Sequence, residues 1–306
     1  MSASLKIQKG HVAYCIQSAA GTFTSHNLLQ QLMLADNVHI IGATYEKSQE
    51  GLVFVPGSTY AEGRNALLYE ACRVEVVRLR FRFSYLVFVD DDIEILGGSF
   101  SAWHSDLLFW EPAVMVPSYR SLLDQRRYKG RPVGVWQYDS FFVAYHRELA
   151  DALLPLNTSL DDAKVCWWSS SFYIQYLSGI HLQGHCLLSD RLVVQGMKEG
   201  TYPRQGCRRN WVWKLIKATH ADIMPSLDDL DKIAGPTWYL EWGVARKRGE
   251  KSYDLSRQNA TNWRLHSWRA PPIKGRRCNL WNNRMVCWTH GVPLPLFPNF
   301  TTAEAP

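Results

Sequence analysis

Apolar runs and segments of helical periodicity alternate along the first hundred residues. Residues 12–16, 38–45 and 85–89 are dominated by apolar side chains, which predicts strands buried on both faces. Residues 25–34 and 61–77 place apolar side chains three and four positions apart, which predicts amphipathic helices. Strands that alternate with helices are typical of right-handed βαβ units, so we expect an α/β fold with a mostly parallel central sheet flanked by helices.

The pattern continues over the next hundred residues. Residues 99–109 predict a helix, residues 113–117 a buried strand and residues 133–145 an extended segment. Residues 160–169 include two acids of the kind found at a helix start, a helical pattern follows through residue 176, and an apolar segment follows at residues 182–194. We therefore expect residues 1–225 to form one domain.

The remaining residues, 226–306, have a different character. Their tryptophans, interspersed with Arg, Lys, Gly and Pro, are Trp238, Trp242, Trp263, Trp268, Trp281 and Trp288. The segment has little helical or alternating period, yet it is too aromatic to be a disordered linker. We expect an irregular C-terminal extension that packs on the domain.

Composition narrows the function classes. The chain has 306 residues, of which 46% are hydrophobic, enough for a sizeable core. It contains no run of about eighteen apolar residues and no signal-peptide pattern, so we expect no membrane span and a cytoplasmic location. The seven cysteines include no Cys-x-x-Cys pair, which argues against a zinc site, and they are too sparse for a disulfide scaffold. The net charge of +6 suits an anionic ligand without requiring nucleic acid, which we do not expect as a partner.

Three consecutive acids, Asp90, Asp91 and Asp92, follow the apolar run at residues 85–89. Ligands of α/β proteins bind just outside the carboxyl ends of the strands. Carboxylate oxygens are the ligands that hard divalent cations prefer, and several of them can converge on one ion. A helix cap, the simplest alternative, needs only one aspartate. The run therefore favours a site for a divalent cation and a phosphorylated ligand.

A second signal lies in the first turn of the helix predicted at residues 61–77. This turn contains Arg64 and Asn65. Free backbone N–H groups at a helix N-terminus bind anions, and an arginine adds a forked donor suited to a phosphate or a neighbouring carboxylate. A surface arginine beside a capping asparagine is the alternative. Together with the aspartates, the pair favours a functional role.

An apolar strand that ends in Asp-x-Asp, preceded by a helix that opens with Arg-Asn, resembles the nucleotide-sugar half of GT-A glycosyltransferases. The resemblance covers roughly residues 11–117 and matches Asp90 and Asp92 to the Asp-x-Asp motif of that family. It implies a GT-A-like, Rossmann-like domain in which residues 1–97 bind the nucleotide sugar and residues 98–225 form the acceptor side.

The same resemblance assigns roles to the acidic strand end. It implies that Asp90 and Asp92 bind Mn²⁺ or Mg²⁺, which bridges the two phosphates of a nucleotide-sugar donor, with a UDP-sugar as the first candidate. Arg64, Asn65 and Asp91 are then expected to contact or orient the donor. The implied partners are this donor and a glycan or another hydroxyl acceptor.

The acids Asp161 and Asp162 resemble the motif that inverting members of this fold carry at a helix start after the metal strand. By this resemblance Asp162 is the expected general base, with Asp161 and Asp139 as alternates. The pair departs from the commoner Glu-Asp form, and a retaining enzyme needs no such base, so the stereochemical outcome stays open. Trp136 and Trp167 are candidates for stacking on a sugar, although a packing role suits a tryptophan equally well.

The expected activity is transfer of a hexosyl or pentosyl group from a nucleotide-diphosphate donor to a hydroxyl acceptor. A nucleotidyltransferase that makes nucleotide sugars is the nearest rival, but such enzymes usually carry a Gly-rich basic loop after the first strand. Here residues 17–22 contain one glycine and no basic residue. A phosphatase of the haloacid dehalogenase type continues from its aspartates into Gly-Thr, whereas this chain continues into Ile-Glu-Ile at residues 93–95. A non-catalytic, Trp-rich protein that binds glycan or nucleic acid is the alternative from another class.

Overall fold

The computed structural model describes residues 5–19, 27–33, 35–119, 132–134, 138–162, 166–181, 186–196, 212, 214–215, 277–281, 284–289 and 292–293. By its internal contacts the chain divides into two compact units, Met1–His266 and Ser267–Pro306. The boundary expected between residues 225 and 226 lies outside the described residues.

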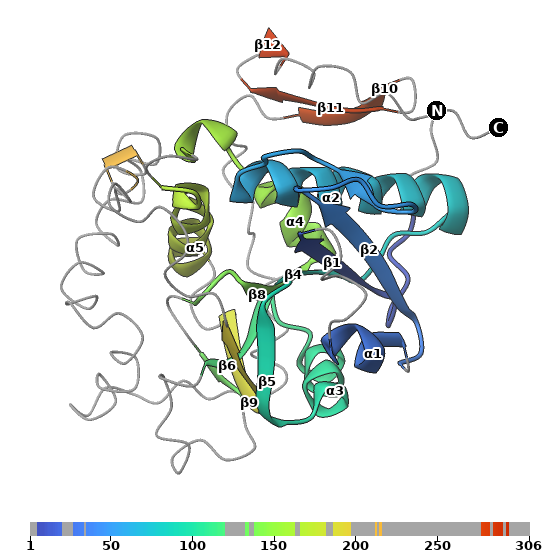
Figure 1. The fold of residues 1–306 in the computed structure, drawn as a ribbon, viewed down its shortest axis with the longest axis vertical. Coiled ribbons are helices and arrows are strands. Elements are labelled where there is room, and N and C mark those ends of the chain that lie inside the picture. The colour runs from blue at the N-terminus through green and yellow to red at the C-terminus, as the bar shows by residue number, and fades with distance from the viewer. Residues whose placement is uncertain are drawn as a thin grey trace. The chain divides into compact units, whose positions relative to one another are not determined.

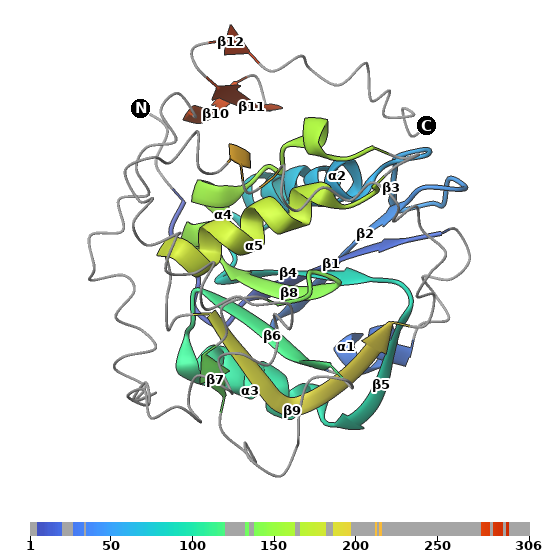
Figure 2. The same cartoon turned by 90° about the vertical axis from the view of Figure 1, so that its left-hand side faces the viewer.

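The first unit is built on a mixed β-sheet with helices on both of its faces (Figures 1 and 2). Its strands are β1 Val12–Ser18, β2 Val38–Thr44, β3 Val53–Phe54, β4 Tyr85–Asp90, β5 Ile93–Gly98, β6 Val114–Tyr119, β7 Val133–Gly134, β8 Phe142–His146 and β9 Cys186–Gly196. Its helices are α1 Asn27–Met33, α2 Tyr60–Val74, α3 Phe100–Trp110, α4 Arg147–Leu153 and α5 Ser169–His181, with a π-helix at Glu75–Leu79 and a 3-10 helix at Thr158–Leu160. Helices α2, α4 and α5 cover one face, and α1 and α3 cover the other (Figure 2).

The strand order places the end of β4 at the centre of the sheet. The order is β3-β2-β1-β4-β8-β6-β9-β5, with β7 paired to β9. Strands β3, β2, β1 and β4 are parallel to one another, while β8 is antiparallel to both β4 and β6. As a result the carboxyl ends of β1, β2, β4 and β6 and the start of β8 lie at one edge of the sheet. Ligands of α/β sheets bind at such an edge.

Helix α2 lies close against the sheet beneath it. Its N-terminus carries a capping box, in which the Thr59 side chain accepts from the Glu62 N–H and the Glu62 carboxylate accepts from the Thr59 N–H at 2.8 Å. Gly63 lies over β1, because a Cβ atom there would come within 2.1 Å of the Gln17 side chain. The sequence thus places a glycine where the helix approaches the strand.

The apolar core fills the space between the sheet and the helices. One cluster of this core contains fully buried side chains of β1, β4 and α3, which are Val12, Tyr14, Ile16, Tyr85, Val87, Val89, Trp103 and Leu107. Burial on this scale is the main stabilising contribution to such a fold. The burial of Tyr85 to Val89 also fixes the position of β4 up to Asp90, where the acids begin.

The predicted α/β class is confirmed, and so are the early strands and helices to within a few residues. Strand β5 and helix α4 were not predicted from the sequence. Strand β5 is short, follows the aspartates after a tight turn and is paired to β9, almost a hundred residues later, so its partner is set by tertiary structure. The helical pattern expected up to residue 176 is observed as α5, which begins at Ser169, whereas the two acids that were expected at a helix start precede this helix.

The second unit, Ser267–Pro306, contains three antiparallel strands, β10 Arg277–Trp281, β11 Arg284–Thr289 and β12 Val292–Pro293. The expected irregular segment therefore includes some regular pairing. In the part of the chain that the structure describes, no helix combines the length and apolar character needed to cross a membrane.

Candidate functional site

The three acids end β4 at the ligand-binding edge of the sheet. Asp90 is the last residue of β4, Asp91 and Asp92 form the turn, and β5 starts at Ile93. In the parallel register Asp90 lies beside Gln17 of β1. The aspartates therefore face the ends of β1 and β2 on one side and the start of β8 on the other.

Arg64 reaches Asp90 from the second turn of α2. Its guanidinium is 2% exposed and donates to the Asp90 carboxylate, and it also donates to the Val89 carbonyl oxygen at 3.0 Å. The group lies over the rings of Tyr60 and Phe88, 5.0 and 5.6 Å from their centroids. Of the two roles expected from the sequence, this geometry favours contact with a carboxylate over contact with a phosphate.

The acids concentrate negative charge at the strand end. Burial raises the pKa of Asp90 to about 7, Arg64 opposes this shift, and the charges of Asp92, Asp91 and Asp139 add to it. Burial together with Asp91, Glu46, Asp90 and Asp92 also raises the pKa of Tyr45, which follows β2. A cation at this edge would relieve the repulsion among the carboxylates. Tyr45 is a site neighbour that sequence reasoning missed, since only the parallel pairing of β2 and β1 brings it near.

Asp91 and Asp92 differ in their surroundings. Asp91 is 8% exposed, and its Oδ2 accepts a hydrogen bond from the Ala19 N–H at 3.2 Å. This bond ties the turn to the end of β1. Asp92 is partly exposed. Asp92 is therefore the more accessible of the two to a ligand at the edge.

Some side-chain atoms at the ends of the neighbouring strands have no hydrogen-bond partner among the described residues. Gln17, Ser18 and Thr44 are at most 4% exposed, and within the described part of the chain Gln17 Oε1, Ser18 Oγ and Thr44 Oγ1 accept or donate no hydrogen bond. Buried polar atoms without partners are uncommon in native proteins. The ends of β1 and β2 thus offer hydrogen-bonding capacity beside the aspartates.

A metal ion at this edge would have few protein ligands. Among the described residues, no group of three or more His, Cys, Asp or Glu side chains could hold a metal ion. The donor set at the edge is nevertheless one of carboxylate oxygens, which suits Mn²⁺ or Mg²⁺, and Mg²⁺ commonly binds through one or two carboxylates plus phosphates and water. The residues fit a cation that arrives with a phosphorylated ligand.

Asn65 contacts the protein backbone. Its side-chain amide donates to the Leu156 carbonyl oxygen at 2.9 Å, and its Oδ1 accepts from the Leu156 N–H at 2.7 Å. Asn65 is 3% exposed. It ties α2 to the segment after α4, and this geometry does not favour the expected contact with a donor.

Asp161 joins the N-termini of two helices. It accepts from the Ala61 N–H of α2 at 2.8 Å, from the Ser170 N–H of α5 at 2.6 Å and from the Ser170 hydroxyl at 2.9 Å. Burial raises its pKa to about 6, and the bonds from Ser170 and Ala61 oppose that shift. A carboxylate with three donors is a positioning group, because its oxygens already accept protein hydrogen bonds.

Asp162 has the surroundings of an accessible carboxylate. Its side chain is exposed, and its backbone forms an isolated bridge with Cys166. Beyond the bridge, the Trp167 indole N–H donates to the Ser58 carbonyl oxygen at 3.1 Å, and its ring contacts Tyr60 edge to face. Trp167 therefore packs against the start of α2 while remaining partly exposed. Trp136 lies outside the described residues.

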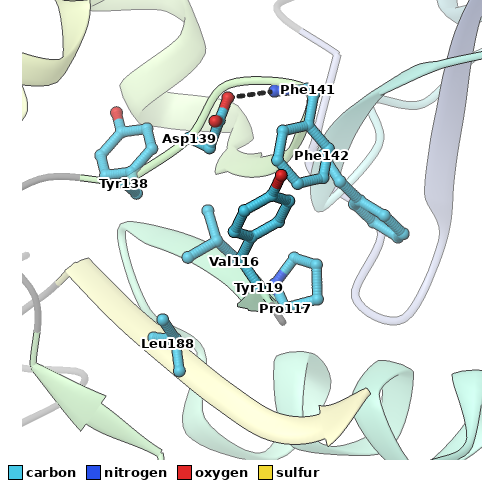
Figure 3. A pocket seen from close by; sticks show the side chains of 8 residues that line it. All are labelled: Val116, Pro117, Tyr119, Tyr138, Asp139, Phe141, Phe142 and Leu188. Atoms are coloured by element: carbon cyan, nitrogen blue, oxygen red, sulfur yellow. Dashed lines mark hydrogen bonds between the residues drawn. The ribbon is translucent and has the colours of Figure 1, made fainter. Parts of the chain in front are cut away.

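Asp139 lies on the other side of the aspartates, just before β8. Its carboxylate is exposed, and Oδ1 accepts from the Phe141 N–H at 3.3 Å (Figure 3). The Asp90 N–H in turn donates to the Phe141 carbonyl oxygen at 2.8 Å. The structure thus brings Asp139, Asp90, Asp91, Asp92 and Arg64 to one edge, with Asp161 and Asp162 near the start of α2.

Comparison with known proteins gives matches by structure alone. No protein-family model matches the chain, and no curated protein sequence matches it. TarS 1-349 of S. aureus is 10% identical with a TM-score of 0.44, and the match covers 92% of this chain and 99% of that one. GalNAc-T7, solved with UDP, GalNAc and Mn²⁺, is 10% identical with a TM-score of 0.43 over 77% of this chain and 54% of that one. A197 from STIV is 12% identical with a TM-score of 0.36 over 62% and 86%. All three TM-scores lie below 0.5, so the proposed function rests on the site and the sequence motif.

Proposed function

We propose that the chain is a metal-dependent, GT-A-like glycosyltransferase that moves a sugar from a nucleotide-diphosphate donor, with a UDP-sugar as first candidate, to a hydroxyl of a glycan acceptor. The observation that carries this proposal is the ion pair of the buried Arg64 with the partly buried Asp90 at the carboxyl end of β4, with Asp92 accessible in the turn. A strand end that holds one aspartate in a fixed orientation beside a second, accessible one suits a cation shared with a diphosphate.

Different side chains at the carboxyl ends of β1, β2 and β4 would contribute to donor binding in different ways. Asp90 and Asp92 would hold Mn²⁺ or Mg²⁺, and Arg64 keeps the Asp90 carboxylate in place from below. The ion, when bound, would neutralise the charge that develops on the departing diphosphate. Gln17, Ser18 and Thr44 supply buried polar atoms next to this position, and hydrogen bonds to a donor would satisfy them.

Asp162 is the proposed general base. It would take the proton from the acceptor hydroxyl as that oxygen attacks the anomeric carbon, and the diphosphate would leave with the bonding electrons. Asp162 is exposed, whereas Asp161 accepts hydrogen bonds from three donors and would hold the loop that carries Asp162. Asp139 remains the alternate base. Inversion at the anomeric carbon follows from this assignment, and a retaining reaction would not need it.

The cellular location stays a prediction. The sequence predicts a cytoplasmic protein.

Titration with UDP in the presence and absence of Mn²⁺ tests the proposal. We expect binding that requires the metal, together with slow hydrolysis of at least one nucleotide sugar, because water can replace an unknown acceptor. Asp92→Asn should abolish both without loss of folded structure. The matched control is Asp36→Asn, which changes an exposed aspartate before β2, at the opposite end of that strand.

Two results would contradict the proposal. Binding of UDP that ignores Mn²⁺ would favour a non-catalytic binding protein, and full activity in Asp92→Asn would remove the metal assignment. For Asp162→Asn we expect donor binding to persist while transfer is lost, and unchanged transfer would move the base to Asp139 or indicate a retaining enzyme.

A further inference from the structure

The second unit, Ser267–Pro306, contains a β-hairpin with a cysteine on each strand. Strand β10 carries Cys278 and β11 carries Cys287, and the antiparallel register places these two residues directly opposite each other (Figure 1). Directly opposite residues share one face of an antiparallel pair. A register shifted by a single residue would put the two cysteines on different faces.

The kind of pair that the cysteines form follows from their distance to the turn. Only residues 282–283, both asparagine, stand between the strands in the sequence, and such two-residue connections are typical of tight hairpins. In a tight hairpin the two residues that flank the turn, here Trp281 and Arg284, exchange hydrogen bonds. Hydrogen-bonded and non-hydrogen-bonded pairs then alternate along the ladder. Cys278 and Cys287 are the third pair beyond the flanking one, so they are a non-hydrogen-bonded pair.

A non-hydrogen-bonded pair suits a disulfide. The Cα atoms of such a pair are about 4.5 Å apart, and a disulfide spans Cα separations of about 4.4–6.8 Å. The backbone register therefore allows a bond between Cys278 and Cys287 without any movement of the strands.

The second unit is also of a size that benefits from such a bond. It is about 40 residues long, and units of this size usually need disulfides, a metal or association to fold stably. Its strands are short, and an isolated hairpin is only marginally stable in water. Seven cysteines are too few for a scaffold of the whole chain, but a single local bond would stabilise this unit.

We propose that Cys278 and Cys287 form a disulfide that closes the hairpin of β10 and β11. The bond forms by thiol–disulfide exchange with a small-molecule disulfide such as oxidised glutathione. The two cysteine thiols lose two protons and two electrons as their S–S bond forms, and the S–S bond of the oxidant breaks to give two thiols. The proposal concerns the second unit alone and does not depend on the proposed function.

The disulfide makes the stability of the second unit depend on redox conditions. A bond across a loop of about ten residues favours the folded hairpin by a factor on the order of a hundred, because it restricts the unfolded chain. In a reducing compartment the two thiols stay open, and an oxidant closes them.

Non-reducing peptide mapping of the full chain tests the bond itself. The protein is equilibrated with mixtures of reduced and oxidised glutathione, thiols are blocked with N-ethylmaleimide, and trypsin cuts after Arg277 and Arg284. Cys278 and Cys287 then fall on separate peptides, residues 278–284 and 285–306. We expect these two peptides to be linked and to separate on reduction. The free cysteines Cys15, Cys72 and Cys186 are internal controls, whose peptides should carry no bond.

The same mapping in concentrated urea shows whether the fold brings the thiols together. Because the paired strands hold the cysteines opposite each other, opening half of the bonds should require about tenfold more reduced glutathione in the folded chain than in urea.

Limited chymotrypsin digestion tests whether the bond stabilises the unit. It follows the removal of residues 267–306 from the full chain with and without dithiothreitol. Reduction should accelerate this removal about tenfold or more in the wild-type protein. The double variant Cys278→Ser, Cys287→Ser should be cleaved at the faster rate in both conditions. Thr289→Ser, a change in β11 that keeps both thiols, should respond as the wild-type protein does.

Three results would overturn the proposal. The first is separate peptides that each carry maleimide, or a bond from either cysteine to a different one. The second is a bond that opens at the same glutathione ratio in the folded chain and in urea. The third is an equal effect of dithiothreitol on the wild-type protein and on the double variant, because the reductant would then act on another part of the chain.

Discussion

Asp90 owes its orientation to a side chain from another element. Arg64 lies 26 residues earlier in the chain, is buried, and forms an ion pair with the Asp90 carboxylate. A buried guanidinium without its carboxylate would be an uncompensated charge in an apolar setting, flanked by Tyr60 and Phe88. The ion pair between Arg64 and Asp90 therefore stabilises the fold, whether or not a ligand is bound.

A double-mutant cycle measures this pairing. Arg64→Met should lower the free energy of unfolding by about 2–4 kcal/mol, because it leaves a partly buried carboxylate without its partner. The double variant with Asp90→Asn should lose less than the sum of the two single variants. Urea unfolding provides the values. Additive losses would mean that the two side chains are not coupled.

Asp161 gives the protein a specific pH dependence. Its pKa is raised from the ordinary value to about 6, mainly by burial, so its contribution to stability is fully present below its unfolded pKa of about 4 and is lost as the pH rises through 6. Relative to Asp161→Asn, the wild-type protein should lose at most about 3 kcal/mol of unfolding free energy between pH 4 and pH 7.

Urea unfolding at a series of pH values checks this dependence. The exposed Asp36→Asn serves as the control, and its difference from the wild-type protein should not follow the same curve. A flat difference for Asp161→Asn across this range would show that burial and the hydrogen bonds to Asp161 cancel.

At the scale of elements, α2 organises the site. Its Arg64 holds Asp90, its N-terminal N–H groups donate to Thr59 and Asp161, and its start packs against Trp167. These contacts come from three separate parts of the chain. A shift of α2 along β1 would therefore displace the proposed metal-binding edge and the loop with the proposed base together.

Gly63 sets the distance between α2 and β1. In Gly63→Ala the added methyl group would meet the buried Gln17 side chain, so we expect a loss of about 1–3 kcal/mol in spite of the better helix propensity of alanine. The control is Gly97→Ala, where an added Cβ meets nothing within 4 Å. Thermal unfolding measures both.

The Gln17→Ala background shows whether this contact is the cause. There Gly63→Ala should cost less than in the wild-type background, because the space under α2 is open. An equal cost in both backgrounds would mean that Gly63 matters for another reason.

At the scale of the whole molecule, the sheet joins two halves that differ in strand direction. Parallel strands β3, β2, β1 and β4 bring unpartnered polar atoms and the aspartates to the edge, and antiparallel β8 brings Asp139 and Phe141 to the same edge. The junction of β4 and β8 thus separates the proposed donor side from the proposed acceptor side.

Ligand binding at this edge should stabilise the whole domain. A ligand at a hundred times its dissociation constant adds about 2.7 kcal/mol to the free energy of unfolding. UDP with Mn²⁺ should therefore raise the melting temperature by several degrees, and EDTA should reverse the shift. Asp92→Asn should show no shift, whereas Asp36→Asn should behave as the wild-type protein does. A shift with UDP that survives EDTA would contradict a shared metal site.

Much of the fold was predictable because it follows local periodicity. Burial of a strand or of a helix face requires apolar residues at regular positions, and these can be read from the sequence. Such patterns predicted the strands at residues 12–16 and 85–89 and the helix at residues 61–77. The pairing of β5 with β9 was not predictable in this way, since register between distant strands depends on the rest of the sheet. The same holds for Tyr45, whose nearness to the aspartates follows from strand order.

The sequence by itself determined the α/β class, the acid run at the end of a buried strand and the arginine near the start of α2, since apolar patterning and residue type are local properties of the chain. Only the tertiary structure decided how these residues are used. It directed Arg64 to Asp90, engaged Asn65 with Leu156, made Asp161 a cap of two helices and set Asp139 at the same edge as the other aspartates. A buried polar group needs a hydrogen-bond partner, and here that partner comes from a segment far away in the sequence. Such segments come together only when the chain folds.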